Sequence, residues 1–175
     1  QTTEAALHLK QTASEALDLG CAALWIPSTP AGKLAPTHPA LDPFWALLES
    51  RDTPFVLHVG GSGSFSDPAF HNNEMPIVEE PGDGERMRSK DFLTIYQSPA
   101  LFLGALILDG LFDRFPRLRG ACIEQGAAWV PSWLRHLDFA HRALSKTEAR
   151  LAVLKRKPAE YVGRHLKVTP SAGEA

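Results

Sequence analysis

Short apolar runs without polar alternation, separated by helical segments, constrain the fold of this chain more than any other feature. Three such runs lie at residues 21–26, 54–59 and 120–124, and a weaker one lies at 165–169. A run in which nearly every side chain is apolar fits a strand buried on both faces, as in a parallel sheet. Strands that alternate with helices indicate an α/β fold with such a sheet. An open doubly wound sheet and a closed barrel both satisfy this pattern.

Helical spacing and helix-boundary residues mark the segments between these runs. Gly20 is a plausible helix stop, and Asp42-Pro43 reads as an N-cap followed by proline at the first helical position. Residues 65–90 form a long polar segment, which is typical of a functional lid or a disordered loop. The expected helices cover residues 3–19, 42–50, 98–115 and 131–156, with a turn or short helix at 158–161.

Length, charge and cysteine content limit the class of protein. The 175 residues are enough for one domain, which we place at 1–175, and the net charge of -2 predicts no nucleic-acid or acidic-membrane partner. No apolar run is long enough to cross a membrane, and the first residues lack the regions of a signal peptide. Cys21 and Cys122 both sit in apolar runs, so we expect buried free thiols and a cytoplasmic protein.

The residues at the strand ends are the best candidates for chemistry, because ligands of parallel α/β folds bind beyond the carboxyl ends of the strands. His58 ends the second apolar run and Glu124 ends the third. Imidazole is a good metal ligand, and a carboxylate can bind metal or move protons. The alternatives are a satisfied core histidine at 58 and a salt bridge from Glu124 to an arginine.

A substrate pocket is the second expectation. Trp25 ends the first apolar run, and His71 and Asn72 lie in the long polar segment, from which they could contact a small-molecule substrate. The alternative for His71 is a solvated loop histidine. The glycine-rich stretch 60–64 departs from the serine-nucleophile pattern, because Ser64 stands where that pattern needs glycine, and it is a weak phosphate-binding signal.

Four stretches, taken together and in order, carry a resemblance to a known family. The last two are the most specific: Phe-Asp-Arg-Phe-Pro-Arg-Leu, and the strand that ends in Glu-x-Gly before Trp-Val-Pro. They resemble the amidohydrolase-related family that includes aminocarboxymuconate semialdehyde decarboxylase and resorcylate decarboxylases. The four stretches lie at 15–27, 41–60, 110–119 and 124–138.

This resemblance implies a (β/α)8 TIM-like barrel of the metal-dependent hydrolase type. It also implies a divalent metal, zinc or manganese, and hydrolysis or non-oxidative decarboxylation of a small, often aromatic, carboxylic acid. His58 matches the family's metal-binding histidine in the middle of the barrel. Glu124 falls where many members carry a histidine that helps proton transfer, so we expect it to act as the catalytic acid or base.

Two departures from the family pattern concern the rest of the metal site. The sequence contains no His-x-His pair and no Ser-Asp-x-Pro-His-like segment after Thr169, where the family supplies further ligands. A complete barrel needs roughly 250 residues, so we expect an internal part of an amidohydrolase-like barrel. The alternative function is a catalytically incomplete fragment or scaffold that acts through self-association. Open sheet edges favour a homo-oligomer in either case.

Overall fold

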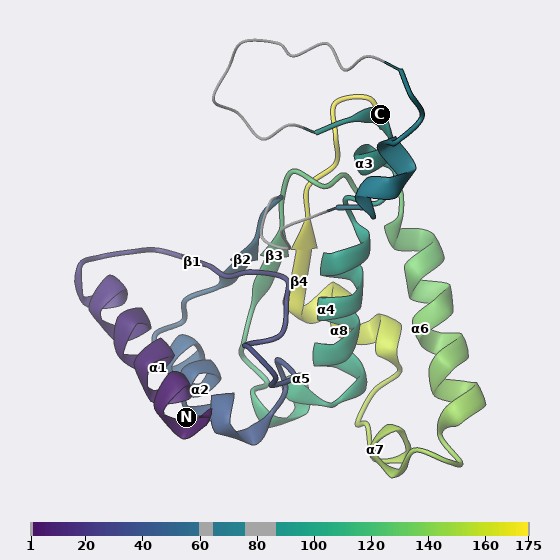
Figure 1. Cartoon of the computed structure of the whole chain (residues 1–175). Helices are drawn as coiled ribbons and strands as arrows, with labels where there is room; N and C mark the ends of the chain where they lie inside the picture. Colours follow the sequence, from purple (N-terminus) through teal and green to yellow (C-terminus); the bar gives the residue numbers. More distant parts are fainter. Residues whose placement is uncertain (1, 60–64, 76–86, 175) are drawn as a thin grey trace.

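Four short parallel strands form the centre of the structure and follow one another across the sheet in chain order (Figure 1). The computed structural model describes residues 2–59, 65–75 and 87–174. A doubly wound sheet reverses its strand order at a switch point, whereas a (β/α)8 barrel adds strands consecutively. The order β1-β2-β3-β4 is therefore that of a partial barrel. The strands are β1 (Leu24–Trp25), β2 (Phe55–Leu57), β3 (Gly120–Cys122) and β4 (Leu166–Val168).

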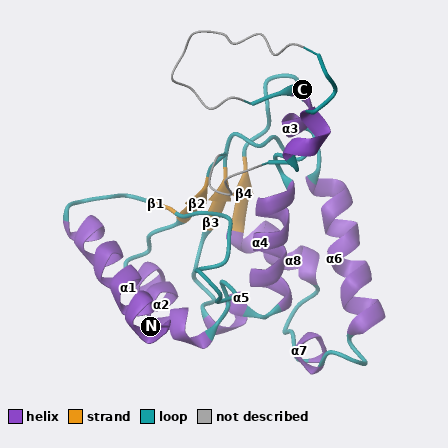
Figure 2. Ribbon diagram, in the orientation of Figure 1, coloured by secondary structure: helices purple, strands orange, loops and turns teal. Residues whose placement is uncertain are grey.

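Helices connect the strands and flank the sheet (Figure 2). Figure 1 shows α1 and α2 beside the β1 end of the sheet and α4, α6 and α8 beside the β4 end. The helices are α1 (Thr2–Asp18), α2 (Asp42–Ser50), α3 (Ser89–Phe92), α4 (Gln97–Leu108), α5 (Leu111–Arg114), α6 (Val130–Leu144), α7 (Ala149–Ala152) and α8 (Pro158–His165), with 3-10 turns η1 (Pro39–Leu41) and η2 (Pro68–His71).

The sheet has one buried face and one open face. Phe55 and Leu57 of β2 are fully buried, and Cys122 of β3 lies beside Leu57 in the register. Side chains paired across neighbouring parallel strands point to the same side, and the next residue points to the other. The row Trp25, Val56, Ala121 and Lys167 therefore shares the second face. Its two end members are exposed, so this face is the one that lines the interior of a barrel.

Close packing between Phe55 and Gly120 fixes the register of the two central strands. A Cβ on Gly120 would lie 2.1 Å from Phe55 Cζ, which only a glycine avoids. The Phe55 ring also makes an edge contact with Trp45 of α2 at 5.5 Å between centroids. The Trp45 indole donates to the carbonyl of Pro36, so this large side chain is buried with its polar atom satisfied.

Several local expectations need correction. The first strand is only Leu24–Trp25, and Cys21 is exposed because it lies in the turn that follows α1. Asp42 is the first residue of α2 rather than its N-cap, and its carboxylate accepts from Arg114 instead. The helix expected at 131–156 ends at Leu144. The hydroxyl and the backbone amide of Thr147 both donate hydrogen bonds to the carbonyl of Leu144 there.

Among the described residues, one segment is long and apolar enough to cross a membrane by length and composition only, whereas the sequence was expected to contain none. It covers Ser89–Leu108, which contains α3 and α4. The two helices are separated by a turn at 93–96, and α4 contacts α5, α6 and α8. Leu103, Leu106 and Ile107 of α4 are fully buried. Burial inside the domain therefore accounts for these apolar residues of α4.

Candidate active site

The structure brings His58 and Glu124 into direct contact beyond neighbouring strands. His58 follows β2 and Glu124 follows β3 by two residues. His58 Nε2 lies 2.8 Å from Glu124 Oε2, and the two side chains are 43% and 61% exposed. Among the residues that the structure describes, the partner of Glu124 is therefore this histidine rather than an arginine. Both side chains remain open to a ligand.

A backbone contact fixes the tautomer of His58. Its Nδ1 lies 2.8 Å from the carbonyl oxygen of Val59, which can only accept, so Nδ1 carries the proton. In the neutral imidazole, Nε2 is then the unprotonated nitrogen, and it faces a carboxylate oxygen. A separation of 2.8 Å is that of a hydrogen bond through one shared proton, and it is too short for a metal ion to lie between the two atoms, since metal–ligand distances are about 2.0–2.2 Å each. A backbone hydrogen bond on the other nitrogen is also the usual support of a metal-binding histidine.

Glu124 reaches His58 from a strained backbone. Its φ is 63°, in the left-handed region that L residues other than glycine rarely occupy. The Glu124 amide donates to the Thr169 hydroxyl at 3.1 Å, and the Thr169 amide donates to the Cys122 carbonyl. Thr169 follows β4, so the third neighbouring strand end holds the Glu124 backbone in place. Strain of this kind recurs at functional sites because it aims a side chain.

The pair fits part of a metal site. A neutral imidazole and a carboxylate are the donors that zinc and manganese accept. A catalytic metal needs about three protein ligands, and within residues 2–59, 65–75 and 87–174 no cluster of three His, Cys, Asp or Glu side chains is placed to hold one. His58 and Glu124 can therefore supply two ligands, and the remaining ligands are not among the described side chains.

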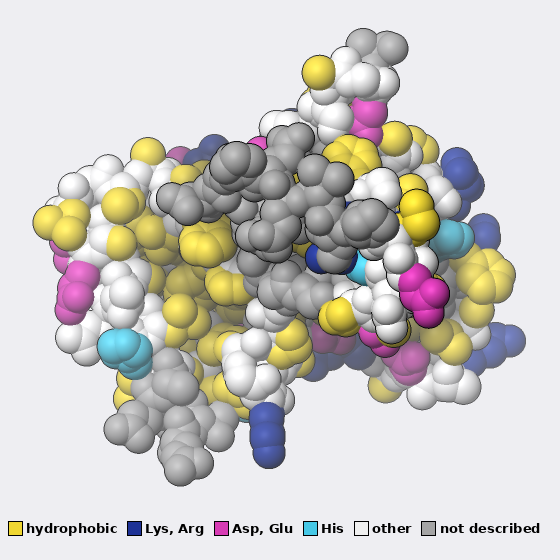
Figure 3. All heavy atoms as spheres, turned by 45° about the horizontal axis from the view of Figure 1, so that its top comes forward, with side chains coloured by type: hydrophobic (Ala, Val, Ile, Leu, Met, Phe, Trp, Pro, Cys, Tyr) yellow, Lys and Arg dark blue, Asp and Glu magenta, His cyan; other side chains and the backbone are white. Residues whose placement is uncertain are grey.

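The residues expected to form the substrate pocket lie in different surroundings. Trp25 is 60% exposed at the open edge of the sheet. In the view that brings the strand ends forward, hydrophobic side chains gather on the side of α1 and β1 (Figure 3). Asn72 is exposed at the end of η2. The glycine-rich stretch 60–64 lies outside the described residues.

His71 is neither solvated nor free. Its side chain is 12% exposed, and its Nε2 lies 2.9 Å from Asp91 Oδ1 and 3.2 Å from Ser66 Oγ. The Ser66 hydroxyl also donates to Asp91 Oδ1, and the Arg88 amide donates to Oδ2. The hydrogen bond from Ser66, followed by those from Arg88 and His71, lowers the pKa of Asp91 to about 2 against the effect of burial. These hydrogen bonds hold residues 65–75 against α3.

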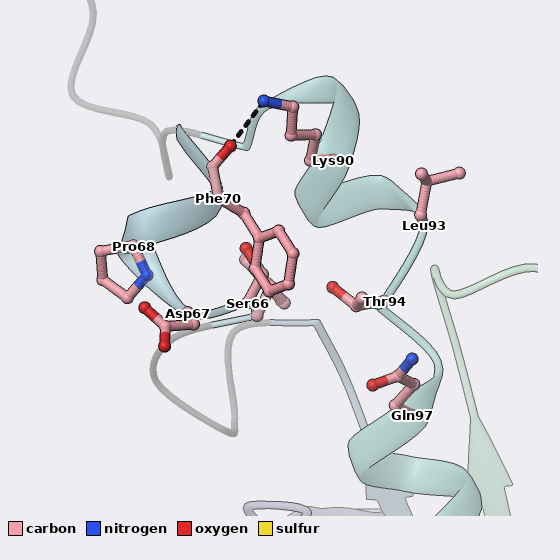
Figure 4. A pocket seen from close by; sticks show the side chains of 9 residues that line it. Ser66, Asp67, Pro68, Phe70, Lys90, Leu93, Thr94 and Gln97 are labelled. Atoms are coloured by element: carbon pink, nitrogen blue, oxygen red, sulfur yellow. Dashed lines mark hydrogen bonds between the residues drawn. The ribbon is translucent and has the colours of Figure 1, made fainter. Parts of the chain in front are cut away.

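Residues 65–70 of this segment form one wall of a cavity of about 950 Å³ (Figure 4). The Phe70 ring of η2 points toward Thr94 and the start of α4, and Leu93 lies on the same wall as Thr94. The Lys90 ammonium donates to the Phe70 carbonyl at 2.5 Å and bridges the two walls. Phe70 and Leu93 are each 70% exposed, so the cavity presents apolar surface to a ligand. Its lining is Phe65, Ser66, Asp67, Pro68, Phe70, Lys90, Leu93, Thr94 and Gln97.

Comparison with known proteins identifies the family. The family model described as "Amidohydrolase" matches residues 12–167, so this chain belongs to the amidohydrolase family. No curated protein matches the sequence.

Similar solved structures include an amidohydrolase and two 5-carboxyvanillate decarboxylases. An amidohydrolase from Mycobacterium avium subsp. paratuberculosis K-10 aligns with a TM-score of 0.72 at 18% identity, covering 94% of this chain and 39% of that one. A 5-carboxyvanillate decarboxylase from Novosphingobium aromaticivorans DSM 12444, complexed with manganese and 4-hydroxy-3-methoxy-5-nitrobenzoic acid, aligns with 0.64 at 25%, covering 97% and 44%. The 5-carboxyvanillate decarboxylase of Sphingomonas paucimobilis aligns with 0.64 at 24%, covering 100% and 47%. The chain thus spans less than half the length of these relatives.

Proposed function

We propose that the protein is a metal-dependent carboxy-lyase or hydrolase that acts on a small aromatic carboxylic acid. The observation that carries the proposal is the 2.8 Å contact of His58 and Glu124 beyond adjacent parallel strands, in a chain of the amidohydrolase family. The scaffold alternative has less support, because the structural relatives include decarboxylases complexed with small aromatic ligands.

His58 and Glu124 have distinct roles in this proposal. His58 Nε2 is a metal ligand, and the Val59 carbonyl keeps its lone pair available by holding the proton on Nδ1. Glu124 Oε2 is placed to accept or return a proton beside that ligand. A bound divalent metal would supply Lewis acidity toward a substrate carboxylate or hydroxyl. Manganese has support from the Novosphingobium relative, and zinc remains the alternative.

The substrate class rests on apolar surface near the strand ends. Trp25 offers an exposed aromatic face on the open side of the sheet, and the cavity between η2 and α4 offers Phe70. His71 would have an indirect role: its contact with Asp91 holds in place the loop that carries Phe70 and Asn72, and those two residues would contact the substrate. Two further elements belong to the proposal: a homo-oligomer that covers open strand edges, and a cytoplasmic location, which the exposed free thiol of Cys21 favours.

Metal content tests the proposal directly. In the whole protein that contains this chain, His58→Ala should remove most of the divalent metal measured by elemental analysis. His136→Ala is the matched control, because His136 is an exposed histidine on α6. CO2 release from a panel of hydroxylated benzoic acids should fall with the metal content. Full metal content in His58→Ala would contradict the assignment.

A further inference from the structure

A second cavity, of about 440 Å³, lies at the opposite end of the sheet from His58. It is bounded by α5, by the connection between α7 and α8, and by the last turn of α8. His165 lines it and directly precedes β4, so the cavity opens at the amino ends of the strands. The proposed function uses none of these residues.

The cavity carries an excess of positive charge. Lys155, Arg156 and Arg164 line it, and within the described part of the chain neither arginine makes an ion pair. The one acidic side chain in the lining, Asp113, is already engaged. Its Oδ1 accepts from the Tyr161 hydroxyl at 2.6 Å and its Oδ2 accepts from the Lys155 amide at 3.1 Å. Both guanidinium groups are therefore available to an external anion.

His165 provides an independent sign of a ligand. It is only 8% exposed and its ring stacks on Phe112 at 4.4 Å between centroids. Its Nδ1 donates to the Leu118 carbonyl at 2.8 Å, which leaves the lone pair on Nε2 in the neutral ring. No described residue forms a hydrogen bond with Nε2. This nitrogen also keeps some solvent exposure, so a ligand can reach it. A buried acceptor thus meets a cavity that is also lined by three cationic side chains, Lys155, Arg156 and Arg164.

We propose that this cavity binds a phosphate group that retains a proton, either free phosphate or a phosphate monoester. Arg156 and Arg164 donate to the unprotonated oxygens, for which guanidinium groups are well suited. His165 Nε2 accepts from the P–OH. Phe112 and Pro116 give the cavity an apolar wall that leaves room for a small ester group. The combination of donors and one acceptor favours phosphate over sulfate, which has no proton to donate at neutral pH.

Titration of the chain with inorganic phosphate tests the proposal by calorimetry and by the imidazole nitrogen signals of His165. We expect saturable binding, a shift of the His165 Nε2 signal, and weaker binding of sulfate. Replacing both Arg156 and Arg164 by Gln should raise the Kd by more than about tenfold, since each removes a charge-assisted hydrogen bond. Arg142→Gln, an exposed arginine on α6 outside the cavity, should change the Kd less than about twofold.

No saturable phosphate binding, an unchanged Kd in the double variant, or equal affinity for sulfate would each overturn the proposal. Phenyl phosphate and inorganic phosphate titrations at pH 6, close to the second pKa of a monoester of about 6, distinguish the source: tighter binding of phenyl phosphate identifies a phosphate ester, and weaker binding identifies free phosphate. Because His58 lies at the other end of the sheet, loss of metal from a His58 variant leaves this test unaffected.

Discussion

Glu124 Oε2 lies 2.8 Å from His58 Nε2, and Glu124 makes this contact from a backbone with φ of 63°. The two residues are 66 positions apart in the chain and meet because β2 and β3 are adjacent parallel strands. A glycine at 124 would remove the strain but would also remove the carboxylate. The strained backbone is therefore retained together with the side chain that faces His58.

Replacing Glu124 by Ala and by Gly separates these two effects. Both variants lose the contact with His58, but only alanine keeps a Cβ in the left-handed region. We expect Glu124→Gly to be more stable than Glu124→Ala by about 1 kcal/mol. Urea unfolding of the two variants measures the difference. Equal stabilities would show that the backbone at 124 relaxes once the carboxylate is gone.

The contact between His58 and Glu124 was predictable because it depends on one rule, that parallel strands end at the same edge. Apolar runs placed His58 and Glu124 at strand ends, and the resemblance placed them in one barrel. Asp91 was missed. It lies in a polar segment without periodicity, and its side-chain partners Ser66 and His71 lie 25 and 20 residues earlier, so nothing local marks it. Thr169 was located as a strand end, but its hydrogen bond to the Glu124 amide depends on tertiary register.

The sequence predicted the order of elements better than their limits. Runs of apolar residues identified all four strands, but β1 includes only two of the six residues expected, since Cys21 belongs to the turn after α1. Proline correctly marked the helix start at 158, but the single helix expected at 98–115 is divided into α4 and α5 at Gly110, whose φ is 70°. The end of α6 was missed because no Gly or Pro lies between Pro131 and Pro158. Helix ends set by Ser and Thr hydrogen bonds leave a weaker pattern.

Gly120 and Gly163 make a matched pair for testing the packing of the central strands. Gly120→Ala places a Cβ against the Phe55 ring, so β3 must move or the ring must turn, and we expect a loss of about 3 kcal/mol. Gly163→Ala in α8 has no atom within 4 Å and a helical backbone, and should stabilise by about 0.5–1 kcal/mol. Thermal and urea unfolding measure both. A tolerated Gly120→Ala would contradict the register between β2 and β3.

The pH dependence of stability should reveal the Asp91 cluster. Hydrogen bonds hold the pKa of Asp91 at about 2, below its usual value of 3.8. A carboxyl whose pKa is lowered by folding stabilises the protein above pH 3.8, and this contribution is lost as the pH falls through about 2. Asp91→Asn should therefore cost about 1 kcal/mol at neutral pH, with a smaller cost in acid.

Urea unfolding from pH 7 down to pH 2.5 provides the measurement, with Glu148→Gln as the control. Glu148 is exposed, and its side chain makes no hydrogen bond with the part of the chain that the structure describes. The gap between wild type and Asp91→Asn should narrow in acid, whereas Glu148→Gln should follow wild type throughout. A gap that stays constant with pH would show that the charge of Asp91 contributes nothing.

Replacing Arg114 by lysine should lower the stability of the fold. Its Nη2 donates to the Thr37 carbonyl at 2.9 Å and to Asp42 Oδ1 at 3.1 Å, so one guanidinium joins α5 to the start of α2. A lysine keeps the charge but not the planar guanidinium, whose second nitrogen, Nη1, also donates to the Asp109 carbonyl at 3.5 Å. We expect Arg114→Lys to lose about 1–3 kcal/mol, whereas Arg142→Lys on the exposed face of α6 should change the free energy of unfolding by less than about 0.5 kcal/mol. Urea unfolding compares the two variants, and equal stabilities would mean that charge alone, rather than the forked geometry, holds these helices together.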